Sequence, residues 1–136
     1  MYKRQGISSV YPQLGFETYM QVINNCDLCL NPYPFGNCNG IVDVLLNGVV
    51  GVCMQGPHLF ESIDQALYRR LGLPEWLIAT DEASYIAAAV RLISDREQRE
   101  QISAAFGTLD SVQALHQGRE AALSAKLLAK LRTKPG

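Results

Sequence analysis

The chain has 136 residues, of which 48% are hydrophobic, and its 12 basic and 13 acidic side chains give a net charge of −1. This length allows one domain with a substantial core. The near-zero charge gives no electrostatic reason to expect a nucleic acid or an acidic membrane surface as partner. No apolar run is as long as a membrane span, and no secretory signal follows the first basic residues. We therefore expect a cytoplasmic globular protein without a membrane span.

Short apolar stretches alternate with helical patterns along the first part of the chain. Phe16, Met20 and Ile23 have the i, i+4, i+7 spacing of an amphipathic helix, and the β-branched run from 49 to 53 is typical of a strand covered on both faces. The predicted elements here are a strand over 6–11, a helix over 16–25, a strand over 27–30, a helix over 41–46 and a strand over 49–53.

The second part continues this alternation. The predicted elements are a helix carrying Leu59, Ile63, Ala66, Leu67 and Leu71, a buried stretch over 76–79, a helix after Thr80 or Asp81 with Ile86, Val90 and Ile93 on one face, a helical region from 97 onward, and a last helix with Leu123, Leu127 and Leu131. Strands separated by helices predict an α/β protein with a parallel sheet and flanking helices on both faces. Binding sites in such sheets lie beyond the carboxyl ends of the strands.

The segment from Pro32 to Asp43 carries the most specific chemistry. A Pro-rich turn runs into the Gly- and Asn-rich loop 36–40, which opens directly into a helical pattern. Backbone N–H groups at such a helix start can face an anion, and Asp43 lies one turn beyond Asn39 on the same helix face. A ligand with a phosphate group at the helix start and hydroxyl groups at the acid would be a nucleotide. The alternative is an ordinary helix start capped by Asn39, with Asp43 solvated.

Other candidate groups have simpler explanations. Cys26 and Cys29 form a single C-x-x-C without a second pair, so reduced thiols are favoured over a zinc site. Glu61 and Asp64 are carboxylates near a helix start and are expected on its surface. His58 is expected as a capping or surface residue, and Trp76 as a core residue rather than a platform for sugar stacking.

Several blocks together resemble a known family: residues 33–43, Gly51-Val52-Cys53, Gly56-Pro57, Ile63-Asp64 and 71–79 (LGLPEWLIA). They are similar to the C-terminal part of the bacterial protein N-glycosyltransferases that modify high-molecular-weight adhesins, which are relatives of the O-GlcNAc transferases. The similarity covers roughly residues 10 to 95, with the blocks in the family's order and spacing.

The resemblance implies that the chain is the second half of the C-terminal domain of a GT-B glycosyltransferase. Enzymes of this type have two Rossmann-like domains. Residues 1–108 would be part of the domain that binds the UDP-sugar, and 109–136 a C-terminal helical extension. The family moves a hexose, with inversion and without a required metal, from UDP-glucose or a related UDP-hexose to asparagine side chains of an acceptor protein such as an adhesin. The family's N-terminal domain, or a second copy of the chain, would be a further partner.

A GT-B site lies between two domains, so we expect the isolated chain to be catalytically silent. The alternative reading is a UDP-binding module or an inactive truncated remnant. By the resemblance, Asn39 and the N–H groups of Asn37, Cys38 and Gly40 would meet the diphosphate, and Asp43 would accept hydrogen bonds from the ribose. These dipoles would stabilise the leaving UDP in place of Mg²⁺. The sequence departs from the family at Cys38 (usually Thr), Met54-Gln55 (usually Lys-Thr), and Phe60 and Ser62 (commonly His).

Overall fold

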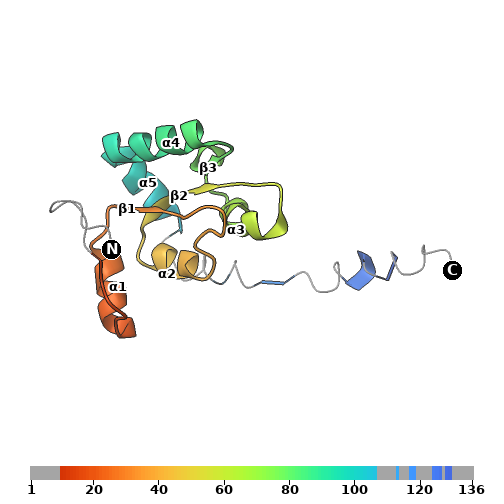
Figure 1. The fold of residues 1–136 in the computed structure, drawn as a ribbon, viewed down its shortest axis with the longest axis horizontal. Coiled ribbons are helices and arrows are strands. Elements are labelled where there is room, and N and C mark those ends of the chain that lie inside the picture. The colour runs from red at the N-terminus through yellow and green to blue at the C-terminus, as the bar shows by residue number, and fades with distance from the viewer. Residues whose placement is uncertain (1–9, 107–112, 114–116, 119–123, 127, 130–136) are drawn as a thin grey trace.

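A parallel three-stranded sheet lies at the centre of the protein (Figure 1). The computed structural model describes residues 10–106, 113, 117–118, 124–126 and 128–129. The strands are β1 (Leu28–Leu30), β2 (Val50–Met54) and β3 (Ile78–Ala79), in the spatial order β1-β2-β3. Leu28 pairs with Val50, and Cys53 pairs with Ile78. All three strands therefore end at the same edge of the sheet.

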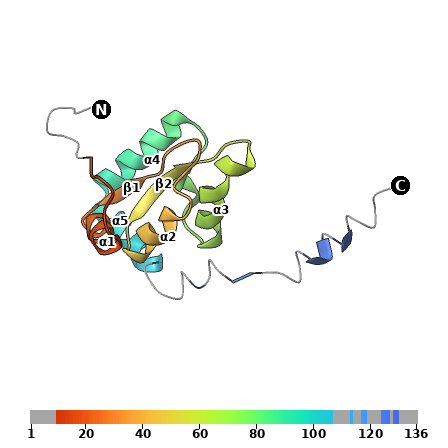
Figure 2. The same ribbon diagram turned by 60° about the horizontal axis from the view of Figure 1, so that its bottom comes forward.

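Between residues 10 and 106 the structure has the helices α1 (Phe16–Asn24), α2 (Gly40–Leu46), α3 (Ile63–Arg70), α4 (Glu82–Ser94) and α5 (Arg96–Phe106). Short 3₁₀ turns precede α3 (Leu59–Glu61) and β3 (Glu75–Leu77). Figures 1 and 2 show α2 and α3 on one side of the sheet and α4 on the other. The predicted α/β class, a Rossmann-like parallel sheet with flanking helices, is confirmed.

The middle strand forms the centre of the core. Val50, Val52 and Cys53 are each at most 1% exposed, as a strand covered by helices on both faces requires. Around β2 the main cluster also contains Ile41, Leu45, Tyr68, Leu73, Leu77, Ile78, Ala88, Ala89, Leu92 and Ile102. At the opposite edge from the strand ends, the hydroxyl of Ser103 on α5 donates to the carbonyl of Gly48, just before β2. This contact ties α5 to the side of the sheet away from the loops described below.

Three sequence-based expectations need correction. Residues 10–11 do not lie in a strand, and the rest of the predicted strand over 6–11 lies outside the described residues. Helix α3 begins only at Ile63, and Leu59 lies before it, 88% exposed. On α4 the residues Ile86, Val90 and Ile93 are more than half exposed, because another face of the helix packs on the sheet. The buried residues of α4 are Ala88, Ala89 and Leu92.

The predicted extension over 109–136 lies largely outside the described residues. Of the described positions in it, 113, 124–126 and 128–129 are helical. The division into 1–108 and 109–136 stays a prediction. In the part of the chain that is described, no helix has the length and apolar character needed to cross a membrane.

Candidate nucleotide-binding loop

The loop between β1 and α2 lies at the carboxyl edge of the sheet, where parallel α/β proteins bind ligands. The stretch from Gln55 to Ser62, between β2 and α3, leaves the same edge. Two residues of the first loop have left-handed backbone conformations, Gly36 with φ +69° and Cys38 with φ +47°. The backbone therefore turns sharply immediately before α2.

The structure brings the predicted residues together at the start of α2. Asn39 precedes the helix and is exposed, and its side chain makes no capping hydrogen bond. Among the residues that the structure describes, none accepts from the backbone N–H of Asn39. The N–H of Gly40 donates to the carbonyl of Asn37 over 2.9 Å. Asn39 thus presents both an unpaired amide and an unused side chain, which the capping alternative does not explain.

Asp43 lies in the first turn of α2, half-buried rather than in the core. Its neighbour is Tyr19 of α1, and burial together with the charge of Asp43 raises the pKa of the Tyr19 hydroxyl. No local pattern in the sequence predicts that Tyr19 and Asp43 are neighbours, because Tyr19 lies before β1 and Asp43 lies after β1. The carboxylate therefore has a hydroxyl partner from another helix.

The carboxylate of Asp64 occupies two of the amides that we expected to meet a diphosphate. Its Oδ2 accepts from the N–H of Asn37 over 2.8 Å, and its Oδ1 accepts from the N–H of Cys38 over 3.1 Å. Asp64 is only 3% exposed, so the expectation of a surface carboxylate was wrong. Burial raises the pKa of its carboxyl, against the opposing effect of the two amides. The Ile63-Asp64 block of the resemblance was the one sequence signal that could have indicated this residue.

Glu61 is likewise buried, at 8% exposure, where we expected a surface residue. Its Oε1 accepts from the Tyr33 hydroxyl over 3.0 Å, and its Oε2 accepts from the N–H of His58 over 2.8 Å. Both acids accept from the facing loop after β1, Glu61 from Tyr33 and Asp64 from Asn37 and Cys38, and a local reading of the helix start could not foresee these contacts. Together they fasten the loop after β1 to the stretch after β2.

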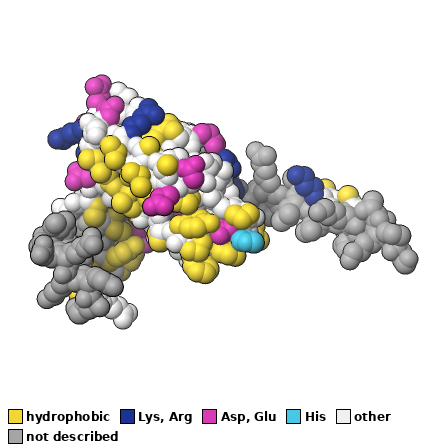
Figure 3. Space-filling view, turned by 45° about the horizontal axis from the view of Figure 1, so that its top comes forward, with side chains coloured by type: hydrophobic (Ala, Val, Ile, Leu, Met, Phe, Trp, Pro, Cys, Tyr) yellow, Lys and Arg dark blue, Asp and Glu magenta, His cyan; other side chains and the backbone are white. Residues whose placement is uncertain are grey.

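An apolar rim borders these loops. Phe35 and Phe60 have ring centroids 5.3 Å apart, and His58 stacks on Phe60 at 5.5 Å. All three side chains are exposed. Figure 3 shows hydrophobic side chains gathered beside a histidine on this face of the molecule. His58 is thus a surface residue, as expected. Trp76 is half-buried against the core with the Arg91 guanidinium 4.0 Å above its ring, which agrees with a packing role.

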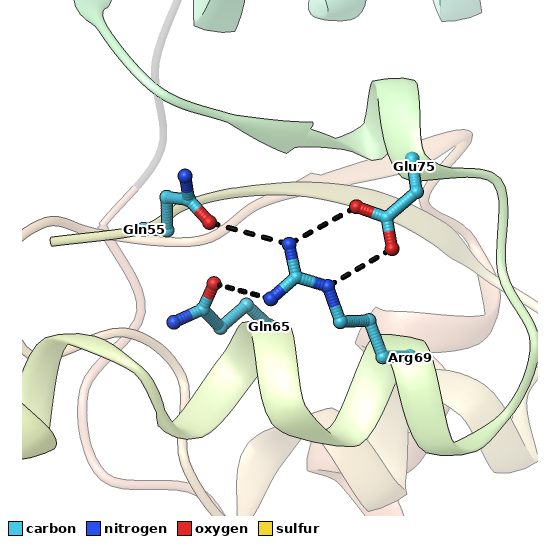
Figure 4. A network of polar contacts seen from close by, with 4 residues as sticks. All are labelled: Gln55, Gln65, Arg69 and Glu75. Carbon is cyan, nitrogen blue, oxygen red and sulfur yellow. Dashed lines mark hydrogen bonds and ion pairs between the residues drawn. The ribbon is translucent and has the colours of Figure 1, made fainter.

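An arginine lies beside Gln55, within the Met54-Gln55 pair where the family usually has Lys-Thr, but this arginine is already paired with an acid. Nε and Nη2 of Arg69 donate to Glu75 over 2.9 and 3.0 Å, and this pairing lowers the pKa of Glu75. The same guanidinium also donates to the side chains of Gln65 and Gln55 (Figure 4). Because Glu75 neutralises it, Arg69 does not supply a free positive charge in place of the lysine.

The described residues contain no group of three or more His, Cys, Asp or Glu side chains that could hold a metal ion. The four cysteines, including Cys26 and Cys29 of the C-x-x-C, are free thiols.

Comparison with known proteins identifies the family. No protein-family model matches the chain. Over 92 residues it is 45% identical to a UDP-glucose:protein N-β-glucosyltransferase of Actinobacillus pleuropneumoniae serotype 5b (strain L20), and equally to that of serotype 7 (strain AP76). The chain belongs to this glycosyltransferase family. The match covers 68% of the chain but only 15% of the length of these relatives. The sequence resemblance is therefore confirmed.

More distant similarity points the same way. A probable UDP-N-acetylglucosamine–peptide N-acetylglucosaminyltransferase SPINDLY of Solanum lycopersicum is 28% identical over 106 residues, covering 68% of this chain and 11% of that protein. The solved structure of a K341M mutant of the Thermobaculum terrenum O-GlcNAc transferase superposes with a TM-score of 0.68 at 20% identity, covering 88% of this chain and 22% of that one. The chain accordingly has the fold of part of that O-GlcNAc transferase.

Proposed function

We propose that this chain supplies the UDP-recognising part of a GT-B glycosyltransferase that moves a hexose from a UDP-sugar to asparagine side chains of a protein. The observation that carries the proposal is that Asn39, at the start of α2, has an unpaired backbone N–H and a side chain that does not cap the helix. Asp43 lies one turn further on, and both residues are at the carboxyl edge of the sheet. The 45% identity to proteins named for UDP-glucose and protein N-glucosylation supports the choice of donor and acceptor.

In this proposal Asn39 binds the diphosphate through its side chain and its backbone N–H, and Asp43 accepts hydrogen bonds from the ribose hydroxyls. Hydrogen bonds to a charged acceptor are stronger than those between neutral groups. The N–H groups of Asn37 and Cys38 already donate to Asp64, so they support the loop instead of meeting the phosphates. Fixed dipoles at the loop would stabilise the leaving UDP without a metal.

Transfer itself would need a second domain, because a GT-B site is formed between two. The edge of β1 that faces away from β2 and the exposed face of α4 are the surfaces on which preceding strands of such a domain, or a second copy of the chain, would pack. The acceptor would be a protein such as an adhesin, and the place of action the cytoplasm. The second candidate is a module that binds UDP without transfer, which the unpaired groups of Asn39 also favour.

Calorimetric titration with UDP tests the proposal on the wild type and on Asp43→Ala. A matched control is Asp27→Ala, which removes an exposed aspartate before β1, at the opposite edge of the sheet. We expect UDP to bind the wild type and the control equally, and Asp43→Ala about tenfold more weakly or worse, as the loss of charged hydrogen bonds implies. The absence of UDP binding by the wild type would overturn the proposal.

Incubation of the chain with radiolabelled UDP-glucose and an asparagine-containing acceptor peptide tests whether transfer needs a second domain. We expect no transfer by the chain alone. Sustained turnover would show that a second domain is not needed.

A further inference from the structure

The loop before α2 needs an external support. Gly36 and Cys38 both have positive φ, and Cys38 carries a Cβ that makes this conformation unfavourable. A residue held in such a conformation persists only when its surroundings fix it. Within the loop, the N–H of Gly36 donates to the carbonyl of Pro32 over 2.7 Å, and the Cys38 thiol donates to the carbonyl of Phe35 over 3.2 Å, but neither bond uses the backbone N–H of Asn37 or Cys38. The shape that presents Asn39 therefore depends on contacts from elsewhere in the fold.

Asp64 supplies these contacts from α3. Its two carboxylate oxygens take the N–H groups of Asn37 and Cys38, one each. The approach is so close that a Cβ on Gly36 would lie 2.4 Å from Oδ2 of Asp64. Only a glycine at position 36 leaves room for the carboxylate. One side chain thus accounts for both unusual features of the loop, the glycine and the left-handed Cys38.

The carboxylate is itself held by buried polar neighbours. Asn31 and Tyr68 are each 2% exposed, and the Asn31 side-chain amide donates to the Tyr68 hydroxyl over 3.3 Å. The side chain of Asn31 also hydrogen-bonds Asp64 and lowers the pKa of its carboxyl, although the effect of burial is larger and the net shift is upward. The N–H groups of Asn37 and Cys38 favour the charged carboxylate, whereas burial opposes the charge.

We propose that Asp64 is the positioning residue of the donor loop. Its carboxylate saturates the amides of Asn37 and Cys38 and thereby turns the amide and side chain of Asn39 toward the diphosphate of the donor. This inference rests on the proposed function, since it assigns Asp64 a role in UDP binding. Asp64 itself does not touch the nucleotide.

The test combines UDP titration with amide hydrogen exchange measured by NMR on the free protein. Asp64→Asn keeps the shape of the side chain but leaves one acceptor oxygen, and its NH₂ group faces the second backbone N–H. The matched control is Asp95→Asn, which changes an exposed aspartate that also accepts a backbone N–H, from Gln98 over 2.9 Å at the start of α5. The exchange of the buried β2 amide of Val52 reports the stability of the whole fold.

We expect Asp64→Asn to bind UDP about tenfold more weakly, with faster exchange at Asn37 and Cys38 and unchanged exchange at Val52. Asp95→Asn should match the wild type in UDP affinity, in exchange at Asn37 and Cys38, and in exchange at Val52. If Asp64→Asn loses the protection of the two loop amides and still binds UDP with wild-type affinity, the positioning role is wrong. Retained protection of both amides in this variant also overturns it.

A second pair of variants applies if Asp64→Asn does not fold. Gly36→Ala and Gly72→Ala both place a Cβ at a φ near +70°, but only the first meets Asp64, and Gly72 has nothing within 4 Å. We expect weaker UDP binding from Gly36→Ala alone, and equal affinities for the two variants would contradict the inference. No binding of UDP by the wild type would instead overturn the proposed function, and the role of Asp64 in donor binding with it.

Discussion

The side-chain amide of Asn31 donates a hydrogen bond of 3.3 Å to the hydroxyl of Tyr68, and so joins the end of β1 to the buried side of α3. The other polar groups of Asn31 are also used: Cys29 Sγ donates to its side-chain oxygen, Tyr85 donates to its carbonyl, and its N–H donates to Val52. Among the described residues, no buried side-chain nitrogen or oxygen lacks a partner. The floor beneath the donor loop is therefore polar and fully paired.

Tyr68→Phe should destabilise the protein. It removes the acceptor of the Asn31 amide in a buried site, and a buried donor that loses its partner costs about 1–3 kcal/mol. Chemical denaturation measures the change in the free energy of unfolding. Tyr11→Phe is the control, since Tyr11 is 58% exposed and should be neutral. Equal stability of the two variants would show that the Asn31–Tyr68 bond contributes nothing.

Gly51→Ala should be destabilising by about 1–3 kcal/mol, the usual cost of overpacking a core. A Cβ on this central-strand residue would lie 2.7 Å from the Tyr68 hydroxyl and 2.9 Å from the Cys29 carbonyl. Gly15→Ala, where nothing lies within 4 Å, is the matched control. In the double variant with Tyr68→Phe, part of the penalty should disappear, because the hydroxyl is gone. Strictly additive effects on thermal denaturation would argue against this contact.

The thiols should differ in reactivity and in their effect on stability at high pH. Burial raises the pKa of Cys53 to about 12 and that of Cys29 to about 11, from 9.0, whereas Cys26 is exposed. A pKa raised in the folded state gives stability that is complete below the unfolded pKa and is lost as the pH rises through the folded pKa. The free energy of unfolding should thus fall above about pH 9.

At pH 8, a chromogenic disulfide reagent should modify Cys26 well before the half-buried Cys29 or the buried Cys53, because the thiolate is the reactive form. Peptide mapping of the modified protein identifies the order. Modification of Cys53 as fast as of Cys26 in the native protein would contradict the prediction.

The exposed face of α4 should promote association. Ile86, Val90 and Ile93 are 53%, 53% and 63% exposed on one helix face, and β1 has a strand on one side only in the described sheet. Exposed apolar faces and open strand edges favour self-association. Sedimentation should therefore show oligomers of the wild type and more monomer for Ile93→Lys, while Leu59→Lys, at an exposed leucine outside α4, should behave as the wild type does. A clean wild-type monomer at high concentration would refute this.

Local patterns in the sequence predicted much of the fold. The run of β-branched residues in β2 and the periodicity of α1 were sufficient to place those elements, because each depends on neighbouring residues. The spacing of Asn39 and Asp43 likewise placed both at the start of α2. On α4 the periodicity found the face with Ile86, but it could not tell which face the sheet covers.

The burial of Asp64 and Glu61 could not be read from local patterns. Near a helix start, a carboxylate is ordinarily a favourable surface residue. Both carboxylates are buried where they accept hydrogen bonds from the loop that follows β1, which precedes β2 in the sequence. The donors are the amides of Asn37 and Cys38 and the Tyr33 hydroxyl. Such contacts join residues 26 to 28 positions apart in the sequence, which a local pattern does not connect.

The two buried acids hydrogen-bond the loop after β1 at separate points, Glu61 at Tyr33 and Asp64 at Asn37 and Cys38. A segment fastened at two points cannot pivot about either one. Any opening or closing at this edge of the sheet should therefore carry the loop and the start of α3 together as one rigid flap, with its hinges outside both segments.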